Sequence, residues 1–538
     1  MKNINFIECT LRDGGYHNLW DFDKSLVNEY LQVCKSLELK NLELGFRFPK
    51  SEEWLGEYAY TSESTLESLS LDDDFNIGVM INASDFIDEE QLNTATINYT
   101  FPFEASNSRI DFIRIATHIK DLNKSLELGQ RLLDKGYKIA INIMQAHNLN
   151  KKVINEFSQL SKDLELQSVY FADSLGCMVP GQINKLVTAL KNSITFPIGI
   201  HAHNNMGLAL ANTVEAVNSG VEWIDMTMTG MGRGPGNTLT EDALFYFSNL
   251  ETENKIELVK LLENFFYPLK EKHNWGSSPY YFLAGMNKVH PLYIQDVTKD
   301  RDFDVNDKIS LIDSLGSVNL ENAQISESYS PNFKEKYFNY FSLVNETDNL
   351  DSNKFKNENF LIIGAGQSVD RYKVEIEKFI ETYKPTVLQL NNHITISEDK
   401  LDFRVSCHPH RLSSKLQNSK KIETIFIIPN LNKSVSIGHH NVLHYDIELV
   451  KDKFTANKNY CTLPNALALT YALAIASKNN SVKNIYLAGI DGYENSNKKN
   501  TELNATLQLY KSVHNLNTLS ITPTSLNIES KSIFSFEI

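Results

Sequence analysis

The sequence is poor in cysteine, has no excess of positive charge and contains no apolar run of membrane-spanning length. Its five cysteines, Cys9, Cys34, Cys177, Cys407 and Cys461, stand singly without a Cys-x-x-Cys pair, which is typical of reduced thiols in a cytoplasm. A formal net charge of -15 argues against general nucleic-acid binding, because no basic surface would collect phosphates. The first residues lack the apolar segment of a signal peptide. We therefore expect a cytoplasmic protein that binds neither nucleic acid nor a membrane.

Strand-like and helix-like patterns alternate through the first half of the chain. With 538 residues, 42% hydrophobic and 22% charged, the chain is an ordinary globular protein of two or three domains. Over residues 1–250, eight apolar strand patterns alternate with helical patterns such as Asp21–Leu39 and Asn123–Lys135, which is the rhythm of a (β/α)8 TIM barrel. The predicted strands are Asn5–Leu11, Asn41–Phe46, Ile77–Ile81, Phe112–Ala116, Lys138–Ile143, Ser168–Asp173, Ile198–His203 and Trp223–Met228.

The pattern changes after residue 250. Residues 251–350 predict a helical extension and a linker, because Ile256–Lys272 has helical periodicity and Asn345–Asn359 is polar without apolar periodicity. A second α/β unit is predicted over residues 357–538, where short apolar strands such as Phe360–Ile363 alternate with helical segments. The expected architecture is a barrel, a helical segment that partly covers it, and a C-terminal Rossmann-like α/β domain.

A glycine-containing turn follows the first strand of the C-terminal unit. Gly364, Gly366 and Ser368 stand where backbone amides at a helix start bind phosphates, so we predict a cofactor-binding turn there. The ligand would be anionic, such as a nucleotide or a nucleotide-sugar. Val369 stands in place of the third glycine of the dinucleotide fingerprint, and a tight turn without a ligand is therefore the alternative.

A metal site is predicted where strands of the barrel end. His201 and His203 are two residues apart at the end of an apolar strand, so their side chains point to the same side. Imidazole and carboxylate ligands suit Mn, Mg, Zn or Fe rather than a thiolate centre. A second pair, His408 and His410, is separated by a proline and is the weaker metal candidate. Because the carboxyl ends of barrel strands meet at one face, the residues expected beside His201 and His203 are Asp13, Glu43 and Asp173.

Three motifs in the first half resemble those of a family of metal-dependent TIM-barrel lyases and synthases. They are Thr10-Leu11-Arg12-Asp13-Gly14, His201-Ala202-His203-Asn204 and Gly230-Met231-Gly232-Arg233-Gly234-Pro235-Gly236-Asn237. The family includes 4-hydroxy-2-oxovalerate aldolase, isopropylmalate synthase and 3-hydroxy-3-methylglutaryl-CoA lyase, and the resemblance covers about 250 residues. It implies a divalent cation, with Mn or Mg expected, bound by Asp13, His201 and His203. It also implies that Asn237 lies at or near the metal and that Arg12 neutralises an enolate oxygen.

The glycine-rich loop distinguishes the branches of this family. It contains no cysteine, unlike the lyase branch, and Arg233-Gly234 stands where the acyltransferase branch has Glu-Arg. Together with Ala172-Asp173-Ser174-Leu175-Gly176, it is closer to the pyruvate aldolases. We therefore predict a class II aldolase, a carbon–carbon lyase that joins or cleaves a pyruvate-like 2-oxo acid and an aldehyde.

Two other functions remain open at this point. One is a Claisen-type acyltransferase that uses acetyl-CoA and a 2-oxo acid, similar to isopropylmalate or citramalate synthase. The other is a non-catalytic barrel that keeps its metal for stability and presents the C-terminal unit as a ligand-binding module, although such a barrel has no need of Arg12. A homo-oligomer is expected in each case.

The proposed chemistry requires a general base for the 4-hydroxyl group of the substrate. His17 is the first candidate, and Tyr16, Tyr280 and Tyr281 are the alternatives.

Three further residues have expected roles near the reaction. Glu43 either holds Arg12 or orients a metal-bound water, and a plain ion pair is the alternative. Ser174 is expected to hydrogen-bond the substrate carboxylate, with Asp173 supporting the site from behind. His290 is expected to be structural or part of a lid.

Overall fold

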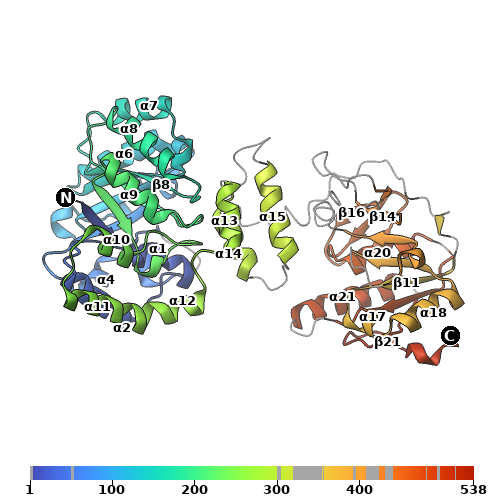
Figure 1. Cartoon of the computed structure of the whole chain (residues 1–538). Helices are drawn as coiled ribbons and strands as arrows, with labels where there is room; N and C mark the ends of the chain where they lie inside the picture. The colour runs from blue at the N-terminus through green and yellow to red at the C-terminus, as the bar shows by residue number, and fades with distance from the viewer. Residues whose placement is uncertain are drawn as a thin grey trace. The chain divides into compact units, whose positions relative to one another are not determined.

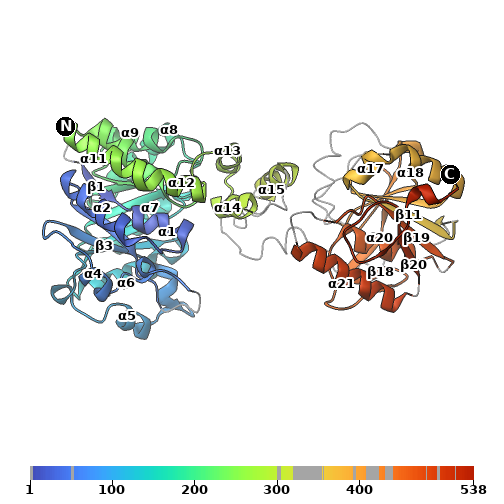
Figure 2. The same ribbon diagram turned by 90° about the horizontal axis from the view of Figure 1, so that it is seen from below.

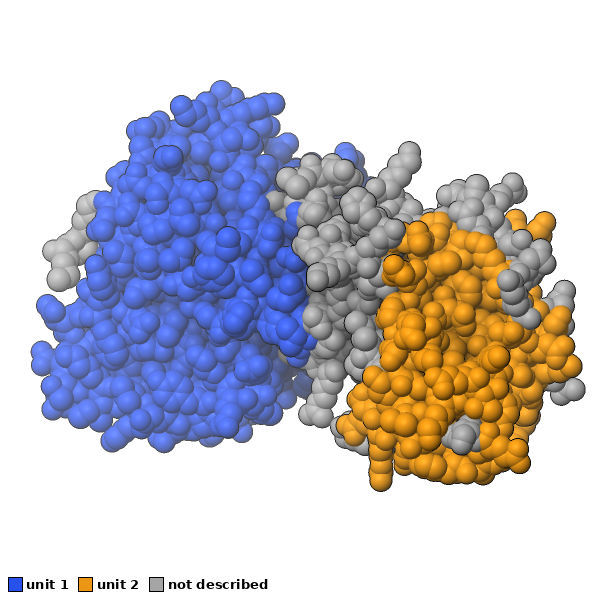
Figure 3. All heavy atoms as spheres, turned by 45° about the vertical axis from the view of Figure 1, so that its right-hand side comes forward, with its two compact units in different colours: residues 1–329 blue, residues 330–538 orange. Residues whose placement is uncertain are grey.

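The computed structural model divides the chain into two compact units, residues 1–329 and 330–538 (Figures 1 and 3). It describes residues 4–49, 54–299, 305–318, 350, 354–355, 357–391, 396–407, 423–429, 440–479, 481–492, 497–514 and 516–537. His408 and His410 lie outside the described residues, as does most of the predicted linker over Asn345–Asn359. Within the described ranges no helix is both long and apolar enough to cross a membrane.

The first unit contains a closed barrel of eight parallel strands, which confirms the predicted TIM barrel (Figure 2). Around the ring the strands follow their order in the chain, and the last pairs with the first, Asn5 beside Trp223. The strands are β1 (Asn5–Glu8), β2 (Asn41–Phe46), β3 (Asn76–Asn82), β6 (Phe112–Thr117), β7 (Lys138–Ile143), β8 (Ser168–Asp173), β9 (Ile198–Ala202) and β10 (Trp223–Met226).

Along each strand, side chains point alternately to the outer helices and to the interior of the barrel. In β9, Ile198, Ile200 and Ala202 belong to the core between the strands and the outer helices. His201, between them, therefore points into the barrel. The interior is filled partly by aromatic rings. A Cβ atom at Gly199 would overlap the ring of Tyr170, so the strand needs glycine at this position.

Helices surround the barrel on the outside (Figure 2). Several begin with a side-chain cap, as where Asp23 accepts a hydrogen bond from the backbone of Ser25. A short hairpin of β4 (Ile87–Asp88) and β5 (Gln91–Leu92) follows β3. The helices are α1 (Thr10–Asn18), α2 (Lys24–Ser36), α3 (Glu57–Tyr60), α4 (Glu63–Glu67), α5 (Thr94–Thr100), α6 (Leu122–Leu133), α7 (Lys151–Ser161), α8 (Pro180–Lys191), α9 (Ala209–Ser219) and α10 (Thr240–Phe247).

A helical segment follows the barrel and packs on its loops. Trp275 donates a hydrogen bond to the carbonyl of Thr229 (3.2 Å), and Ser277 donates one to the carbonyl of Asn204 (3.1 Å). Both carbonyls belong to loops that follow barrel strands, so the segment covers the C-terminal end of the barrel. Its helices are α11 (Thr252–Leu261), α12 (Tyr267–His273), α13 (Pro279–Met286), α14 (Pro291–Lys299) and α15 (Val305–Val318).

The second unit is a parallel eight-stranded sheet in the order β15-β14-β13-β12-β11-β19-β20-β21. Helix α18 (Lys373–Tyr383) packs on one face and α20 (Ala468–Ser477) with α21 (Asn497–Val513) on the other. A smaller sheet has the order β16-β18-β17. The strands are β11 (Asn359–Ile363), β12 (Thr386–Leu390), β13 (Phe403–Val405), β14 (Ile425–Ile428), β15 (Val442–His444), β16 (Asp446–Leu449), β17 (Thr455–Ala456), β18 (Tyr460–Leu463), β19 (Asn484–Ala488), β20 (Asn517–Ser520) and β21 (Glu529–Ser530); α17 spans Gln367–Arg371.

Candidate active site and metal-binding cluster

The Arg12-Asp13 pair lies in a helix rather than in the turn that its neighbouring glycines suggest. β1 ends at Glu8 and α1 begins at Thr10, so the prediction of a strand through Leu11 was wrong for its last residues. Gly14 and Gly15 are required by close packing rather than by a turn. A Cβ atom at Gly14 would lie 2.7 Å from the Met231 sulfur, and one at Gly15 would overlap the Trp20 ring. As a result, Arg12 and Asp13 stand in the first turn of α1, at the mouth of the barrel.

Asp13, His201 and His203 come together in the barrel and form a cluster that fits a divalent cation. One ligand atom from each lies within 4.8 Å of the others, and all three residues are at most 3% exposed. The carboxylate Oδ2 of Asp13 is 3.7 Å from Nε2 of His201, and the two imidazole rings are 5.0 Å apart. One carboxylate and two imidazoles suit the borderline and hard divalent cations.

Protonation states in this cluster also favour metal binding. Burial raises the pKa of Asp13, but the charges of Arg12 and the histidines outweigh it and hold the pKa well below its usual range. Burial is the main cause that holds the pKa of His203 well below its ordinary value. The Nδ1 atom of His201 lies 2.8 Å from Oδ2 of Asp225. A proton shared there leaves the Nε2 lone pair of His201 facing Asp13, as a metal-binding histidine requires.

A buried ion-pair network surrounds the cluster. Arg12 donates through Nε to Glu43 and through Nη1 to Asp13, both at 2.7 Å, while its Nη2 has no hydrogen bond. Arg114 donates to Asp225 (2.7 Å) and to Glu43 (3.3 Å). Glu43 thus forms an ion pair with Arg12, and a role for it in the reaction stays a prediction. Three carboxylates face two guanidinium groups, so one negative charge remains to be balanced.

Arg114 and Asp225 were missed in the sequence, although each carries a recognisable signal. Both interrupt apolar strand patterns at positions that point into the barrel, where a charge is costly without a partner. Arg114 also lies 4.1 Å above the ring of Tyr170. A buried charge in a strand therefore indicates a partner elsewhere in the barrel.

Asn237 and Gly232 bring the glycine-rich loop against the cluster. Nδ2 of Asn237 donates to Oδ2 of Asp13, and its Oδ1 is buried without a hydrogen bond. A Cβ atom at Gly232 would lie 2.7 Å from the same Asp13 oxygen, so position 232 must be glycine. Asn237 thus adjoins the cluster, and its role as a metal ligand stays a prediction.

The candidate general bases occupy different places around the mouth. His17 has its Nε2 2.8 Å from the carbonyl of Gly232, so this nitrogen carries the proton, and its ring lies 5.4 Å from that of Trp275. Burial raises the pKa of both Tyr16 and Tyr281. Tyrosinate is correspondingly harder to form at either position.

Tyr280, the fourth candidate base, faces the helical segment. Its ring lies 5.6 Å from Nζ of Lys308 in α15. None of the four candidates is assigned as the base by this geometry.

Ser174 and Asp173 lie at the end of β8. The hydroxyl of Ser174 accepts a hydrogen bond from the backbone N–H of Gln145 (3.0 Å). Asp173 accepts hydrogen bonds from the backbones of Cys177 (3.0 Å) and Met178 (3.1 Å), and burial raises its pKa to about 6. Asp173 therefore shapes the turn after β8, and the substrate contact of Ser174 stays a prediction.

Cys9, with His201 and Asp225, is a second group of possible ligands. Burial raises the pKa of the Cys9 thiol well above its usual range, reinforced by the charge of Asp225. The thiol keeps its proton, and only the thiolate is a good ligand. The cluster of Asp13, His201 and His203 is therefore the better metal site.

The predicted anion-binding turn of the second unit is occupied by an aspartate. Asp491, after β19, accepts hydrogen bonds from the backbone N–H of Ser368 (2.9 Å) and from its hydroxyl. A Cβ atom at Gly366 would overlap the Asp491 carboxylate, and one at Gly364 would overlap the carbonyl of Gly489. Close packing explains both glycines, and a ligand at this turn stays a prediction.

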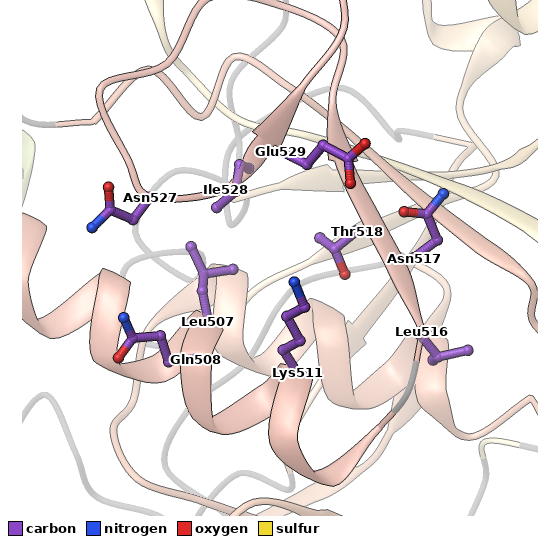
Figure 4. Close-up of a pocket in the computed structure, with 9 residues that line it drawn as sticks. All are labelled: Leu507, Gln508, Lys511, Leu516, Asn517, Thr518, Asn527, Ile528 and Glu529. Atoms are coloured by element: carbon purple, nitrogen blue, oxygen red, sulfur yellow. The ribbon is translucent and has the colours of Figure 1, made fainter.

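A surface pocket in the second unit lies between α21 and the strands β20 and β21 (Figure 4). Lys511, Asn517, Asn527 and Glu529 are among its lining residues. None of the predicted site residues lines it.

Comparison with known proteins agrees with this geometry over the barrel. Residues 3–264 match the family model described as HMGL-like. The 4-hydroxy-2-oxovalerate aldolases of Pelotomaculum thermopropionicum and Brevibacillus brevis are 32% and 33% identical over 159 and 154 residues. These matches cover 30% and 29% of this chain and 47% and 45% of the relatives, so the chain spans about half the length of the curated relatives it matches.

Two solved structures are also similar to part of this chain. The N-terminal domain of a candidate aldolase from Bacteroides vulgatus is 27% identical, with a TM-score of 0.48, over 55% of this chain and 97% of that one. The HMG-CoA lyase of Bacillus subtilis is 15% identical, with a TM-score of 0.40, over 51% of this chain and 95% of that one.

Proposed function

Because residues 3–264 are an HMGL-like domain, we propose that this domain is a divalent-metal-dependent aldolase acting on a 2-oxo acid and an aldehyde. HMGL-like enzymes carry out aldol or Claisen chemistry at carbon–carbon bonds. The partial similarity to 4-hydroxy-2-oxovalerate aldolases favours the aldol reaction and a pyruvate-like 2-oxo acid.

The observation that carries the proposal is the buried cluster of Asp13, His201 and His203 beside a guanidinium group with an open N–H. When bound there, a divalent cation acts as a Lewis acid toward the oxygens of a 2-oxo acid. Mn and Mg are the preferred candidates, since the cluster contains no thiolate. Asp225 orients His201 from behind, as in other metal sites with a carboxylate bound to a ligating histidine.

Arg12 is the group that would stabilise negative charge on the substrate oxygen. Glu43 and Asp13 hold its Nε and Nη1 atoms, so the guanidinium is fixed before substrate arrives. Its Nη2 atom lies 3.9 Å from Oδ2 of Asp225 without a hydrogen bond, so it can donate one to an oxygen on which charge develops. The network of three carboxylates and two arginines carries one negative charge. A divalent cation therefore leaves one positive charge, which matches one substrate carboxylate.

His17 is the proposed general base. Its Nε2 donates to the carbonyl of Gly232, so proton transfer uses the other ring nitrogen or requires this bond to open. Tyr16 and Tyr281 are less favourable, because burial raises the pKa of both. Ser174 is proposed to contact the substrate carboxylate.

Exchange of the pyruvate methyl protons in heavy water, followed by NMR, tests the first half of the reaction without any aldehyde. We expect exchange by the purified protein with Mn or Mg, loss of exchange with a chelator, and recovery when the metal is restored. His203→Ala should lose both exchange and bound metal, whereas His514→Ala, in the second unit, should lose neither.

A second assay decides between aldol and Claisen chemistry. Cleavage of a 4-hydroxy-2-oxo acid to pyruvate supports the proposal. Release of a thiol from acetyl-CoA in the presence of a 2-oxo acid, without such cleavage, would assign the acyltransferase function instead. Full exchange in the presence of chelator would contradict the metal requirement.

A further inference from the structure

Arg233 lies in the glycine-rich loop between the metal-binding cluster and the helices that cover the barrel. The residue before it, Gly232, adjoins Asp13. The residue after it, Gly234, donates its backbone N–H to Gln295 of α14 (3.1 Å). A Cβ atom at Gly234 would also lie 2.7 Å from Pro291 in the same helix. The backbone of Arg233 is therefore held at the mouth, on the side of the cluster that faces α14.

Unlike Arg12 and Arg114, Arg233 forms no ion pair with a carboxylate that the structure describes. Among the residues that the structure describes, no carboxylate lies within 4.0 Å of its guanidinium group, and its Nε is buried without a hydrogen bond. The guanidinium carbon lies 5.5 Å from the ring centroid of Tyr16, which is a cation–π contact. Burial is the main cause that lowers the pKa of both His203 and His290, and the nearby positive charge of Arg233 adds to it.

With a divalent cation bound, the formal charges around the mouth sum to two positive charges, which two anionic groups would balance. Asp13, Glu43 and Asp225 carry three negative charges, and Arg12 and Arg114 carry two positive charges that they pair with. Adding Arg233 brings the balance to zero, and a divalent cation brings it to two positive charges. One substrate carboxylate leaves one positive charge unbalanced, and a half-buried guanidinium group without a partner is unfavourable.

We propose that Arg233 binds an anionic group, a carboxylate or a phosphate, at the far end of the aldehyde substrate. The inference rests on the proposed aldolase function and names the class of the second substrate, an anionic aldehyde. The 2-oxo acid is assigned to the cluster and Arg12 inside the barrel. The aldehyde must then occupy the outer side of the cluster, where Arg233 stands. A guanidinium group suits this task, because its planar donors bind carboxylate or phosphate oxygens in pairs.

Substrate preference tests this assignment. Wild type, Arg233→Gln and Arg233→Lys would be assayed with pyruvate and matched aldehydes, succinic semialdehyde against butanal and glyceraldehyde 3-phosphate against glyceraldehyde. We expect wild type to prefer the anionic member of at least one pair. In Arg233→Gln the ratio of kcat/KM for that anionic aldehyde to its neutral match should fall about 10- to 100-fold. Arg233→Lys should keep part of the preference. The control is Arg47→Gln, which removes a buried arginine paired with Glu63 outside the mouth and should leave the ratio unchanged.

Two outcomes would overturn the inference while leaving the aldolase function intact. One is an unchanged preference in Arg233→Gln. The other is an equal loss with anionic and neutral aldehydes together with loss of pyruvate proton exchange, which would assign Arg233 to the 2-oxo acid instead.

Failure of the aldolase function itself gives a different result, namely no exchange and no carbon–carbon bond formation in wild type. In that case, calorimetric titration with succinate and with inorganic phosphate still tests the anion site. Binding of either that weakens at least tenfold in Arg233→Gln supports an anion site at Arg233. Equal binding, or no binding, in both proteins would overturn it.

Discussion

Arg12 is held by two carboxylates, and its Nη2 group makes no hydrogen bond and lies 3.9 Å from Asp225, a geometry that lysine cannot reproduce. Arg12→Lys keeps the positive charge but loses either the bond to Glu43 or the bond to Asp13 together with the open Nη2 group. We expect turnover to fall by a factor of about 100 to 1,000, with metal content retained. The measurement is the rate of pyruvate proton exchange and of carbon–carbon cleavage, with metal analysis alongside.

The pattern of the two rates shows which half of the reaction Arg12 serves. Loss of both places it at the 2-oxo acid. Exchange at the wild-type rate with failed bond formation would place it at the aldehyde. If neither rate changes, Arg12 is only an ion-pair partner and the proposed mechanism is wrong. Arg47→Lys is the matched control, since Arg47 is a buried arginine whose ion pair with Glu63 (3.0 Å) lies outside the network.

Asp225 acts on the metal site through His201. Asp225→Asn keeps an oxygen for Nδ1 of His201 but removes the charge that fixes the proton there and that pairs with Arg114. We expect the affinity for Mn to fall about 10- to 100-fold, as is usual when the partner of a ligating histidine is changed. Isothermal titration with Mn measures it. As a control, Asp173→Asn changes a buried carboxylate in β8 that holds a turn, and the Mn affinity of this variant should stay at the wild-type value. Equal affinities in all three proteins would mean that His201 needs no carboxylate behind it.

At the scale of elements, the glycine-rich loop is anchored by a titratable residue. Glu241, in the first turn of α10, accepts a hydrogen bond from the backbone N–H of Thr229 (3.0 Å), a residue held at φ 53°. Burial is the main cause that raises the pKa of Glu241 from 4.5 to about 7. The folded protein therefore binds a proton at Glu241 that the unfolded chain has released between about pH 4.5 and pH 7. Stability from this group is present below that range and is lost as the pH rises through it.

Glu241→Gln removes this dependence and keeps an oxygen for the N–H of Thr229. Between pH 5 and pH 8 we expect the free energy of unfolding of wild type to fall by up to about 3 kcal/mol more than that of the variant. All four tryptophans, Trp20, Trp54, Trp223 and Trp275, lie in the first unit, so fluorescence in urea reports that unit alone. Asp173 contributes a slope of the same sign, because burial raises its pKa to about 6. The variant therefore reduces the slope without abolishing it, and equal slopes in both proteins would contradict the prediction.

At the scale of the whole molecule, each unit has a hydrophobic core of its own. The barrel clusters draw their buried residues from Ile7 to Trp275, and the cores of the second unit draw theirs from Leu350 to Ile533. We therefore expect a chain truncated after residue 329 to fold, to bind metal and to unfold with the same tryptophan fluorescence transition as the full chain. Calorimetry of the full chain should then show two transitions. A loss of more than about 2 kcal/mol in the truncated chain would show that the units stabilise each other.

Much of the barrel follows from local patterns in the sequence. Alternating apolar residues predicted the eight strands, because each strand buries one face against the outer helices. The same alternation placed His201 and His203 on one side of β9. Since parallel strands in a barrel end at one face, the sequence also placed Asp13 beside them before any contact was known.

Other features were decided only by contacts between distant segments. The Gly14-Gly15 pair favours a turn locally, yet it lies in α1 because Met231 and Trp20 occupy the space where its side chains would be. A helix tolerates two glycines when packing leaves no room for anything larger. In the second unit, the Gly364–Ser368 turn looks like an anion site, while Asp491, more than a hundred residues away, supplies the anion in the structure.

The buried ion-pair network also combines features that the sequence indicates with features that only the tertiary structure decides. Local sequence indicates that Arg114 and Asp225 are charges in buried strands, but it cannot indicate that they lie 2.7 Å apart. That distance depends on closure of the barrel, which brings β6 and β10 around one interior although 111 residues separate the pair. The residue types thus determined which groups the site contains. The tertiary structure decided which of them neutralise one another, because a buried charge is stable only beside its partner and only the closed barrel brings these partners together.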